Sequence, residues 1–545
     1  MYHEKKGHTM NTALQSPSMD AEVDRHDDGE DTRELLKSTH THELVIALCG
    51  PIGSPLHDVS SAIKETLSNK YGYDCREIRL SHFIQDHAER TGGESAIPRA
   101  PKIARVEKLI EFGDRMRGRL GGSVLAELAI SKIRLDRQAN GKDELGKKFV
   151  ARRVCHIINS IKNQAELDLL REVYREVLFV FGVFSPVSKR ERNLLELGYP
   201  REKIQALMER DAKGGGDSGQ TVGDTFPQSD FFLRMETNST ITLQTKVERY
   251  LDLILGSKIV TPTKEESAMY AAASAASSSA CLSRQVGAAV TDKDGDILAV
   301  GWNDVPKAFG GLYHFDREND PAGANDLRCY NQGKRCFNDD EKTTLAEALI
   351  ETLGEDLIDP KKVDAAVKKI LTDKRLQGLI EFSRAIHAEM HAIINAMRLG
   401  GDKISKGKIF VTTYPCHGCA RHIVASGVSE VYYIEPYRKS LALQLHSDAL
   451  TENETDLNHV RILPFEGVAP SRYLSIFQMR PDSRKKDGRT IPIVPNQALP
   501  KLVKSLQSLP ELEALVVDKL AQKGIFGVES LARQGGEDGS ETAGA

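Results

Sequence analysis

A chain of 545 residues is too long for a single hydrophobic core, so we expect two or three domains. Hydrophobic residues make up 40% and charged residues 28%, as in ordinary globular proteins, and the net charge of −4 provides no basic excess for holding a nucleic-acid backbone. The 8 cysteines are too few for a disulfide scaffold. We find no membrane-spanning run and no signal peptide, so we expect a cytoplasmic protein.

The first part of the chain alternates short apolar runs with segments of helical periodicity, after a polar, acidic stretch at residues 1–40 that we expect to be a disordered tail. Four apolar runs predict strands, at residues 44–48, 74–80, 154–158 and 178–181. The segments 56–70 and 164–177 predict helices between them. This alternation predicts an α/β domain over residues 41–255, with a parallel sheet covered on both faces.

A second domain is predicted over residues 260–480. Thr263 and Glu266 form a capping box, which predicts the start of a helix. Residues 287–291 and 297–301 flank an Asp-Lys-Asp-Gly turn and predict a β-hairpin.

A polar, glycine-rich insertion is predicted at about residues 307–360, where it would form part of a substrate mouth or a gate. Its Cys329 and Cys336 do not complete a tetrahedral zinc site with any third residue that we can name, so we expect loop cysteines without a metal. Residues 481–545 are predicted to be a C-terminal extension with an amphipathic helix near residues 502–520 and a disordered end.

His387, Cys416 and Cys419 provide three of the ligands that zinc prefers, and they leave the fourth tetrahedral position open for water. A helix predicted at residues 383–398 places His387 near its start, and the cysteines fall in the first turn of a second helix, where the helix dipole favours thiolates. Glu389 is predicted to be the proton shuttle of a catalytic site. The sequence therefore predicts a Zn(2+) site with one catalytic carboxylate.

A structural zinc site is the alternative interpretation. It would need a fourth protein ligand, and His391 and His417 are the candidates.

The region from about residue 265 to 437 resembles the deoxycytidylate deaminase family of the cytidine deaminase superfamily. The segments that carry the resemblance are residues 283–288 (SRQVGA), 301–306 (GWNDVP), 387–389 (HAE) and 414–420. The resemblance implies an α/β/α sandwich on a five-stranded mixed sheet. It also implies that Asn303 lies beside the sugar and base, that the backbone at Ala388 reads the pyrimidine edge, and that the phosphate end lies near Arg284.

The loop after the first predicted strand resembles the phosphate-binding loop of nucleotide kinases such as dephospho-coenzyme A kinase. Leu56 and His57 stand where Lys and Ser or Thr are needed, so we expect a degenerate P-loop domain without kinase activity. The backbone at Gly50, Gly53 and Ser54 could still hold a regulatory nucleotide, and a scaffold without any ligand is equally compatible with these residues.

The pairing of the two domains resembles the bacterial antiviral dCTP deaminases. This resemblance implies hydrolytic deamination of free dCTP, and of dCMP, which starves phage replication. The alternatives are a dCMP deaminase of pyrimidine salvage, a deaminase of cytosine or adenine in a polynucleotide, and a nucleotide sensor with a structural zinc. We expect no membrane and no nucleic-acid partner, and we expect a homo-oligomer.

Overall fold

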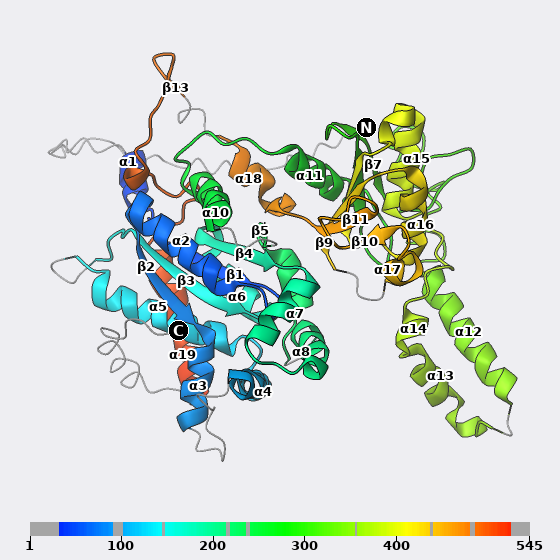
Figure 1. Ribbon diagram of the computed structural model, residues 1–545, viewed down its shortest axis with the longest axis horizontal. Coiled ribbons are helices and arrows are strands. Elements are labelled where there is room, and N and C mark those ends of the chain that lie inside the picture. The colour runs from blue at the N-terminus through cyan, green and yellow to red at the C-terminus, as the bar shows by residue number, and fades with distance from the viewer. Residues whose placement is uncertain are drawn as a thin grey trace, which may run out of the picture.

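The computed structural model describes residues 32–90, 102–143, 148–213, 219–235, 240–354, 357–436, 440–479 and 485–524. Two six-stranded sheets, each flanked by helices, account for most of these residues (Figure 1). Residues 1–31 of the predicted tail and the predicted disordered end of the extension lie outside the described residues, whereas Thr32–Ser38 form helix α1. Among the described helices, none has the length and apolar character needed to cross a membrane.

The first sheet has the strand order β12-β5-β4-β1-β3-β2. Its strands are parallel except for the edge strand β12, which pairs antiparallel with β5. The strands are β1 (Leu44–Cys49), β2 (Asp74–Arg79), β3 (Val154–Ile161), β4 (Leu178–Phe184), β5 (Phe231–Arg234) and β12 (Gly467–Val468).

Helices cover both faces of this sheet because every residue of β1 is buried and successive residues face opposite sides. The odd-numbered residues of β1 share a core with α5 (Val124–Asn140) and α6 (Gln164–Tyr174). The even-numbered residues share a second core with α2 (Leu56–Tyr71) and α10 (Thr240–Leu255). The predicted α/β architecture of this region is therefore confirmed.

The second sheet is mixed and has the order β10-β11-β9-β8-β6-β7. Its strands are β6 (Gly287–Thr291), β7 (Ile297–Trp302), β8 (Lys408–Thr413), β9 (Glu430–Glu435), β10 (Leu450–Thr451) and β11 (Val460–Pro464). Helices α15 (Ala388–Gly400) and α16 (His417–Ser426) pack on one face, and α11 (Lys264–Ala276) packs on the other. The sandwich has six strands rather than the expected five, because the two-residue β10 adds to the edge of β11.

Gly301 allows α15 to lie directly on the β6–β7 hairpin. A Cβ atom at this position would lie 2.3 Å from the Ala392 nitrogen and 2.7 Å from the Ala388 oxygen. Only glycine permits this approach, which places the first turn of α15 beside the end of β7.

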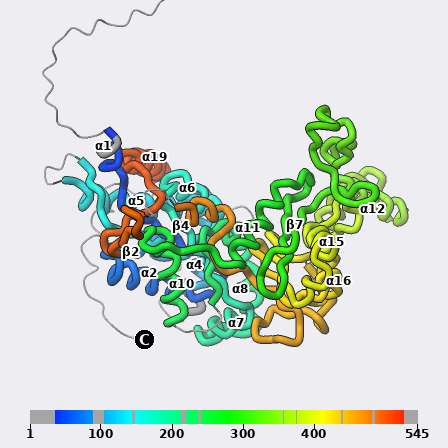
Figure 2. The backbone as a smooth tube through the Cα atoms, turned by 90° about the horizontal axis from the view of Figure 1, so that it is seen from above, coloured from blue at the N-terminus to red at the C-terminus, as the bar shows by residue number. Residues whose placement is uncertain are grey.

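Three predicted elements differ from the structure. The helix expected from residue 383 begins at Ala388, because His387 has an extended backbone and serves as its N-cap. The insertion contains a long helix, α12 (Phe337–Leu353), which projects from the second sheet together with α13 (Val363–Leu371) and α14 (Lys374–Gln377) (Figures 1 and 2). The helix expected near residues 502–520 is α19 (Ser508–Gln522).

The remaining elements are short or peripheral. They are α3 (Leu80–Arg90), α4 (Lys102–Leu120), α7 (Val187–Glu196), α8 (Arg201–Lys213), α9 (Val222–Thr225), α17 (Ala442–Leu445), α18 (Tyr473–Phe477) and the hairpin of β13 (Lys485–Lys486) and β14 (Arg489–Thr490).

The two sheets are joined through Glu266 of α11, which is the glutamate of the capping box at the start of this helix. The Glu266 carboxylate accepts a hydrogen bond from the Val468 nitrogen of β12 at 2.9 Å, and it forms an ion pair with Arg249 of α10 at 2.7 Å. Residues from the predicted second domain therefore complete the first sheet.

The C-terminal helix α19 is held against α5 by a buried charge cluster. Arg137 is 1% exposed, donates two hydrogen bonds of 3.0 Å to Glu513 of α19, and lies 2.7 Å from Glu43. Tyr174 donates a further hydrogen bond to Glu513 at 3.2 Å. The extension is thus part of the first domain's core.

Replacing Arg137 by methionine is expected to lower the free energy of unfolding by about 3–5 kcal/mol, because two buried carboxylates lose their shared cation. Urea denaturation followed by circular dichroism measures the change. The control is Lys132→Met on the exposed side of the same helix, for which we expect a change below about 0.5 kcal/mol. Equal effects of the two substitutions would contradict this interpretation of the cluster.

Candidate metal centre

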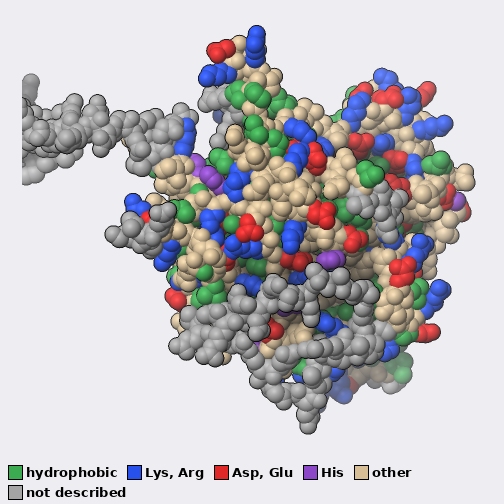
Figure 3. Space-filling model, turned by 60° about the vertical axis from the view of Figure 1, so that its left-hand side comes forward, with side chains coloured by type: hydrophobic (Ala, Val, Ile, Leu, Met, Phe, Trp, Pro, Cys, Tyr) green, Lys and Arg blue, Asp and Glu red, His purple; other side chains and the backbone are tan. Residues whose placement is uncertain are grey.

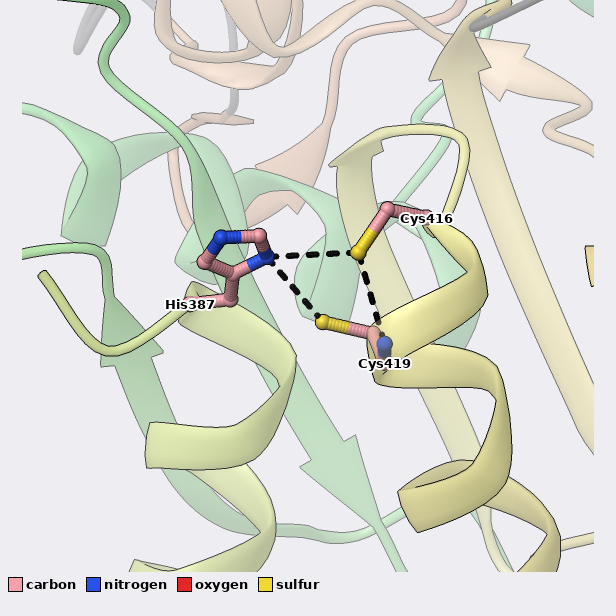
Figure 4. Close-up of side chains that lie close together, drawn as sticks. All are labelled: His387, Cys416 and Cys419. Carbon is pink, nitrogen blue, oxygen red and sulfur yellow. Dashed lines mark hydrogen bonds between the residues drawn. The ribbon is translucent and has the colours of Figure 1, made fainter. Parts of the chain in front are cut away.

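Three predicted ligands converge between the starts of two helices (Figure 4). His387 is the N-cap of α15, Cys416 is the N-cap of α16, and Cys419 lies in the first turn of α16. The His387 Nδ1 atom lies 3.4 Å from the Cys416 sulfur and 3.3 Å from the Cys419 sulfur. These three ligand atoms all lie within 4.8 Å of one another.

This spacing fits a tetrahedral zinc ion. Zinc bonds of about 2.0–2.1 Å to nitrogen and about 2.3 Å to sulfur separate the two ligand atoms by about 3.5 Å. The observed separations of 3.3 and 3.4 Å are close to that value. The predicted zinc site is therefore confirmed as a three-ligand cluster that leaves one coordination position for water or substrate.

The mutual hydrogen bond of the two thiols shifts their pKa values in opposite directions. The hydrogen bond from the Cys419 thiol lowers the pKa of Cys416 to about 4, with help from His387 and against the effect of burial. The pKa of Cys419 is raised well above its usual value, because the neighbouring Cys416 sulfur carries the charge and burial adds to the effect. Since zinc binds thiolates, metal binding would release the proton that Cys419 retains.

Glu389 lies in the first turn of α15 and is 4% exposed. Burial raises the pKa of this carboxyl group, although the His387 charge opposes the shift. Its carboxylate interacts with the Cys419 thiol, so it lies beside the ligand cluster. A buried carboxylate with a raised pKa, next to a metal site, suits a group that accepts and donates protons.

Neither candidate for a fourth protein ligand joins the cluster. The His391 side chain accepts a hydrogen bond from the backbone nitrogen of Trp302 at 3.2 Å, and burial lowers the pKa of His391. His417 lies 3.3 Å from Glu381. Among the described residues, the ligand cluster contains only the histidine and the two cysteines, which fits a site with an open position.

A cavity of about 530 Å³ opens beside the ligands and is lined by His387, Glu389 and Cys416. The insertion also contributes to its wall, through Asn338 and Lys342 of α12. Neither residue was predicted, because nothing in the sequence of an insertion indicates which face of its helix turns toward the catalytic pocket.

The predicted substrate-binding residues Asn303, Ala388 and Arg284 all line this cavity. The side-chain oxygen of Asn303 accepts from the Val286 nitrogen at 2.7 Å, and its side-chain nitrogen donates to the Arg284 oxygen at 2.8 Å. Each atom retains capacity for one more hydrogen bond. Asn303 therefore shapes the loop as well as facing the pocket, and Arg284 pairs with Glu435 at 3.1 Å.

The two insertion cysteines lie apart from the ligand cluster. Cys336 is the N-cap of α12, and its sulfur lies 3.4 Å from the Ser283 hydroxyl. Cys329 is partly buried, which raises the pKa of its thiol.

The loop predicted to be a degenerate phosphate loop is closed by an internal carboxylate. Asp211 of α8 is 1% exposed and accepts the Ile52 N–H at 2.7 Å. Its other oxygen accepts from Lys162 at 2.8 Å, and Lys162 also donates to the Gly50 oxygen at 2.8 Å. Asp211 thus takes the position that an anion would need at Ile52.

Of the other two predicted loop residues, Gly53 contacts α7, and Ser54 does not hydrogen-bond through its side chain to the described part of the chain. A Cβ atom on Gly53, whose φ is +83°, would lie 2.8 Å from the Arg190 oxygen, and the Gly53 oxygen accepts from Asn193 at 2.8 Å. The Ser54 hydroxyl is buried and makes no hydrogen bond within the described residues. Nucleotide binding at Gly50, Gly53 and Ser54 remains a prediction, and the internal contacts of this loop speak against it.

The three zinc ligands and the two helices that position them, α15 and α16, lie between residues 262 and 435. Residues 262–435 match the sequence model of the cytidine and deoxycytidylate deaminase zinc-binding region, so the chain contains a domain of that family.

Three known proteins are similar to parts of this chain. The deoxycytidylate deaminase of Enterobacteria phage T4 is 29% identical over 164 residues, which cover 30% of this chain and 72% of that protein. ComE operon protein 2 of Bacillus subtilis is 41% identical over 56 residues, so the match covers 10% of this chain and only 29% of the relative. A crystal structure of the dCMP deaminase of cyanophage S-TIM5 with dCMP and dUMP aligns at 20% identity and a TM-score of 0.21, covering 38% of this chain and 99% of that one.

Proposed function

We propose that this protein is a zinc-dependent hydrolase that removes the 4-amino group of a free deoxycytidine nucleotide and leaves the deoxyuridine nucleotide. The observation that carries the proposal is the buried Glu389 carboxylate beside the zinc ligands in a cavity of about 530 Å³. The similarity to the T4 protein, which is named a deoxycytidylate deaminase, supports the same substrate class.

In the proposed reaction, His387, Cys416 and Cys419 would hold the zinc ion, which would lower the pKa of a water molecule so that the water can act as the nucleophile. Glu389 would accept a proton from the attacking water and donate it to ring nitrogen N3. It would then accept the second proton of that water, from the new hydroxyl on C4, and donate it to the 4-amino group, which leaves as ammonia while C4 becomes a carbonyl carbon. Burial raises the pKa of Glu389, which favours a carboxyl group that both accepts and donates protons. Asn303 and the backbone at Ala388 would orient the pyrimidine from the pocket wall.

Within this class we propose dCTP ahead of dCMP, and removal of dCTP as an anti-phage defence. Two cations from separate segments, Arg284 and Lys342, line the pocket and would favour a highly charged phosphate chain. The pairing of a deaminase domain with an α/β domain that carries a degenerate phosphate loop supports the defence role.

A dCMP deaminase of pyrimidine salvage would use the same residues and differs only in the number of phosphates accepted. A polynucleotide deaminase would need an electropositive groove. The net charge of −4 favours a free nucleotide. Basic and acidic side chains are interspersed on the face shown in Figure 3, which is the side of the first domain. A sensor with a structural zinc would need a fourth protein ligand, and neither of the predicted candidates, His391 and His417, joins the cluster.

Chromatography after incubation with dCTP, dCMP, deoxycytidine and single-stranded DNA tests the proposal. We expect dUTP from dCTP as the fastest reaction and no uracil in the DNA. The proposal would be overturned if cytosine were converted to uracil only in DNA. It would also be overturned if the zinc-loaded protein deaminated no cytosine compound.

Replacing Lys342 by alanine is expected to raise KM for dCTP about tenfold, because one charge-assisted contact with phosphate is lost. The KM for deoxycytidine, which has no phosphate, should change little. Lys368→Ala, on the exposed surface of α13, is the control. Equal losses for the nucleoside and the nucleotide would show that Lys342 supports the pocket wall, where it donates to the Gln377 oxygen, rather than the phosphate.

A further inference from the structure

A second large cleft lies between the two sheets and is separate from the zinc ligands. Two adjoining cavities of about 730 and 580 Å³ share a common wall. That wall consists of Phe184, Val187, Glu191, Tyr433, Glu452 and Pro464. We call this space the interdomain cleft. It lies at the carboxyl ends of β1 and β4, where open α/β sheets commonly bind ligands.

The smaller cavity combines aromatic rings with carboxylates. Phe226, Tyr414 and Tyr433 line it, and the rings of the two tyrosines meet at 4.9 Å in a T-shaped arrangement. Glu452 is exposed to the cleft, but protein atoms surround most of its carboxyl group. This burial raises the pKa of the carboxyl group, whereas Tyr414 and Arg190 lower it. Aromatic faces and a carboxylate acceptor are the groups that bind a planar, donor-bearing ring.

The larger cavity combines two cations and neutral hydrogen-bonding groups with the carboxylates of Glu191, Glu452 and Glu454. Ser188, Lys189 and Arg192 of α7 line one side, and Asn453 and Thr455 line the other. Lys189 is partly buried, which lowers its pKa, although Asp58 opposes the shift. Two cations beside hydroxyl and amide groups are suited to phosphate.

We propose that the interdomain cleft binds a nucleotide, with its base on Tyr433 and Glu452 and its phosphates at Lys189 and Arg192. This site adjoins the predicted loop at Gly50, since Pro51 lines the smaller cavity, but it does not use the Ile52 N–H, which Asp211 already accepts. The proposal goes beyond the deaminase activity, because binding here does not depend on turnover.

The cleft and the catalytic pocket share one residue, Tyr414. Tyr414 lines both cavities and hydrogen-bonds to Glu452. It also stands two residues before the zinc ligand Cys416. A ligand that contacts Glu452 would therefore act, through Tyr414, on the segment that contains the zinc ligand Cys416. This contact would couple ligand binding in the interdomain cleft to the catalytic pocket.

Titration calorimetry on the full-length, zinc-loaded protein tests this site with GTP, ATP and dTTP, none of which carries cytosine. We expect at least one of them to bind with a stoichiometry of one per chain. Glu452→Gln and Arg192→Ala should each weaken that binding at least tenfold. Glu351→Gln, on the exposed surface of α12, should leave it unchanged.

Zinc content and circular dichroism of each variant establish that it is folded, and Arg192 is exposed, so its replacement should not disturb the core. The proposal is overturned if none of the three nucleotides binds. It is equally overturned if both cleft variants bind as tightly as the original protein. Because the readout is heat of binding, failure of the deaminase proposal would leave this result interpretable.

Discussion

Replacing Glu389 by glutamine is expected to reduce kcat for dCTP by about a thousandfold or more while leaving one zinc per chain. Glutamine keeps the shape of the side chain but cannot carry a proton between water, ring nitrogen and amine. The carboxylate is buried beside the ligand cluster, so no solvent-exposed group can replace it easily. Steady-state kinetics and metal analysis of the same preparation measure both quantities.

The matched control is Glu381→Gln. This carboxylate is also close to the metal-binding segment, through His417 at 3.3 Å, but it is largely exposed. We expect the kcat of the Glu381→Gln variant to change by no more than about twofold, because most surface substitutions have small effects. Full activity of the Glu389 variant would refute its role as proton shuttle, and loss of its zinc would show that the carboxylate supports the metal instead.

Replacing Cys416 by alanine is expected to remove zinc and activity together. Two ligands remain, and we expect zinc affinity to fall by more than about a hundredfold, since even loss of a group outside the coordination sphere costs 10- to 100-fold. The melting temperature should also fall, because metal binding stabilises the folded state in proportion to the logarithm of its affinity. Metal analysis and scanning calorimetry, with and without a chelator, measure these effects.

Cys281→Ala is the control for Cys416→Ala. Cys281 lines the same cavity but does not belong to the ligand cluster. The Cys281→Ala variant should retain one zinc per chain, and its melting temperature should stay within a few degrees of that of the original protein. If Cys416→Ala kept its zinc, or if chelation left the original protein's melting temperature unchanged, the assigned metal centre would be wrong.

The zinc site could be predicted because its residues lie in short motifs at helix starts. His387 and Glu389 are two positions apart, and Cys416 and Cys419 are three apart, so local helix geometry directs them before any long-range contact forms. The alternation of apolar runs and helical segments likewise predicted the α/β fold, which the structure and the family match confirm. The proton-shuttle role of Glu389 and the substrate roles of Asn303, Ala388 and Arg284 remain predictions, although all four residues line the cavity.

The contacts that could not be predicted join residues far apart in the chain. Lys342 reaches the catalytic cavity from the insertion, and Asp211 closes the phosphate loop at Ile52, 159 residues away. Local periodicity and motif spacing contain no information about such contacts. Sequence reasoning predicted a phosphate loop without its lysine, which remains a prediction, and it did not identify Asp211, the carboxylate that contacts this loop.

By itself, the sequence determined the metal, its three ligands and the class of fold, because these depend on residue type and on spacing within one or two helical turns. The tertiary structure alone decided that β12 completes the first sheet, that α19 packs on α5 through Arg137 and Glu513, and that Tyr414 lies between two cavities. The physical reason is that burial and charge pairing between distant segments depend on how two separately formed sheets pack, and no local pattern encodes that packing.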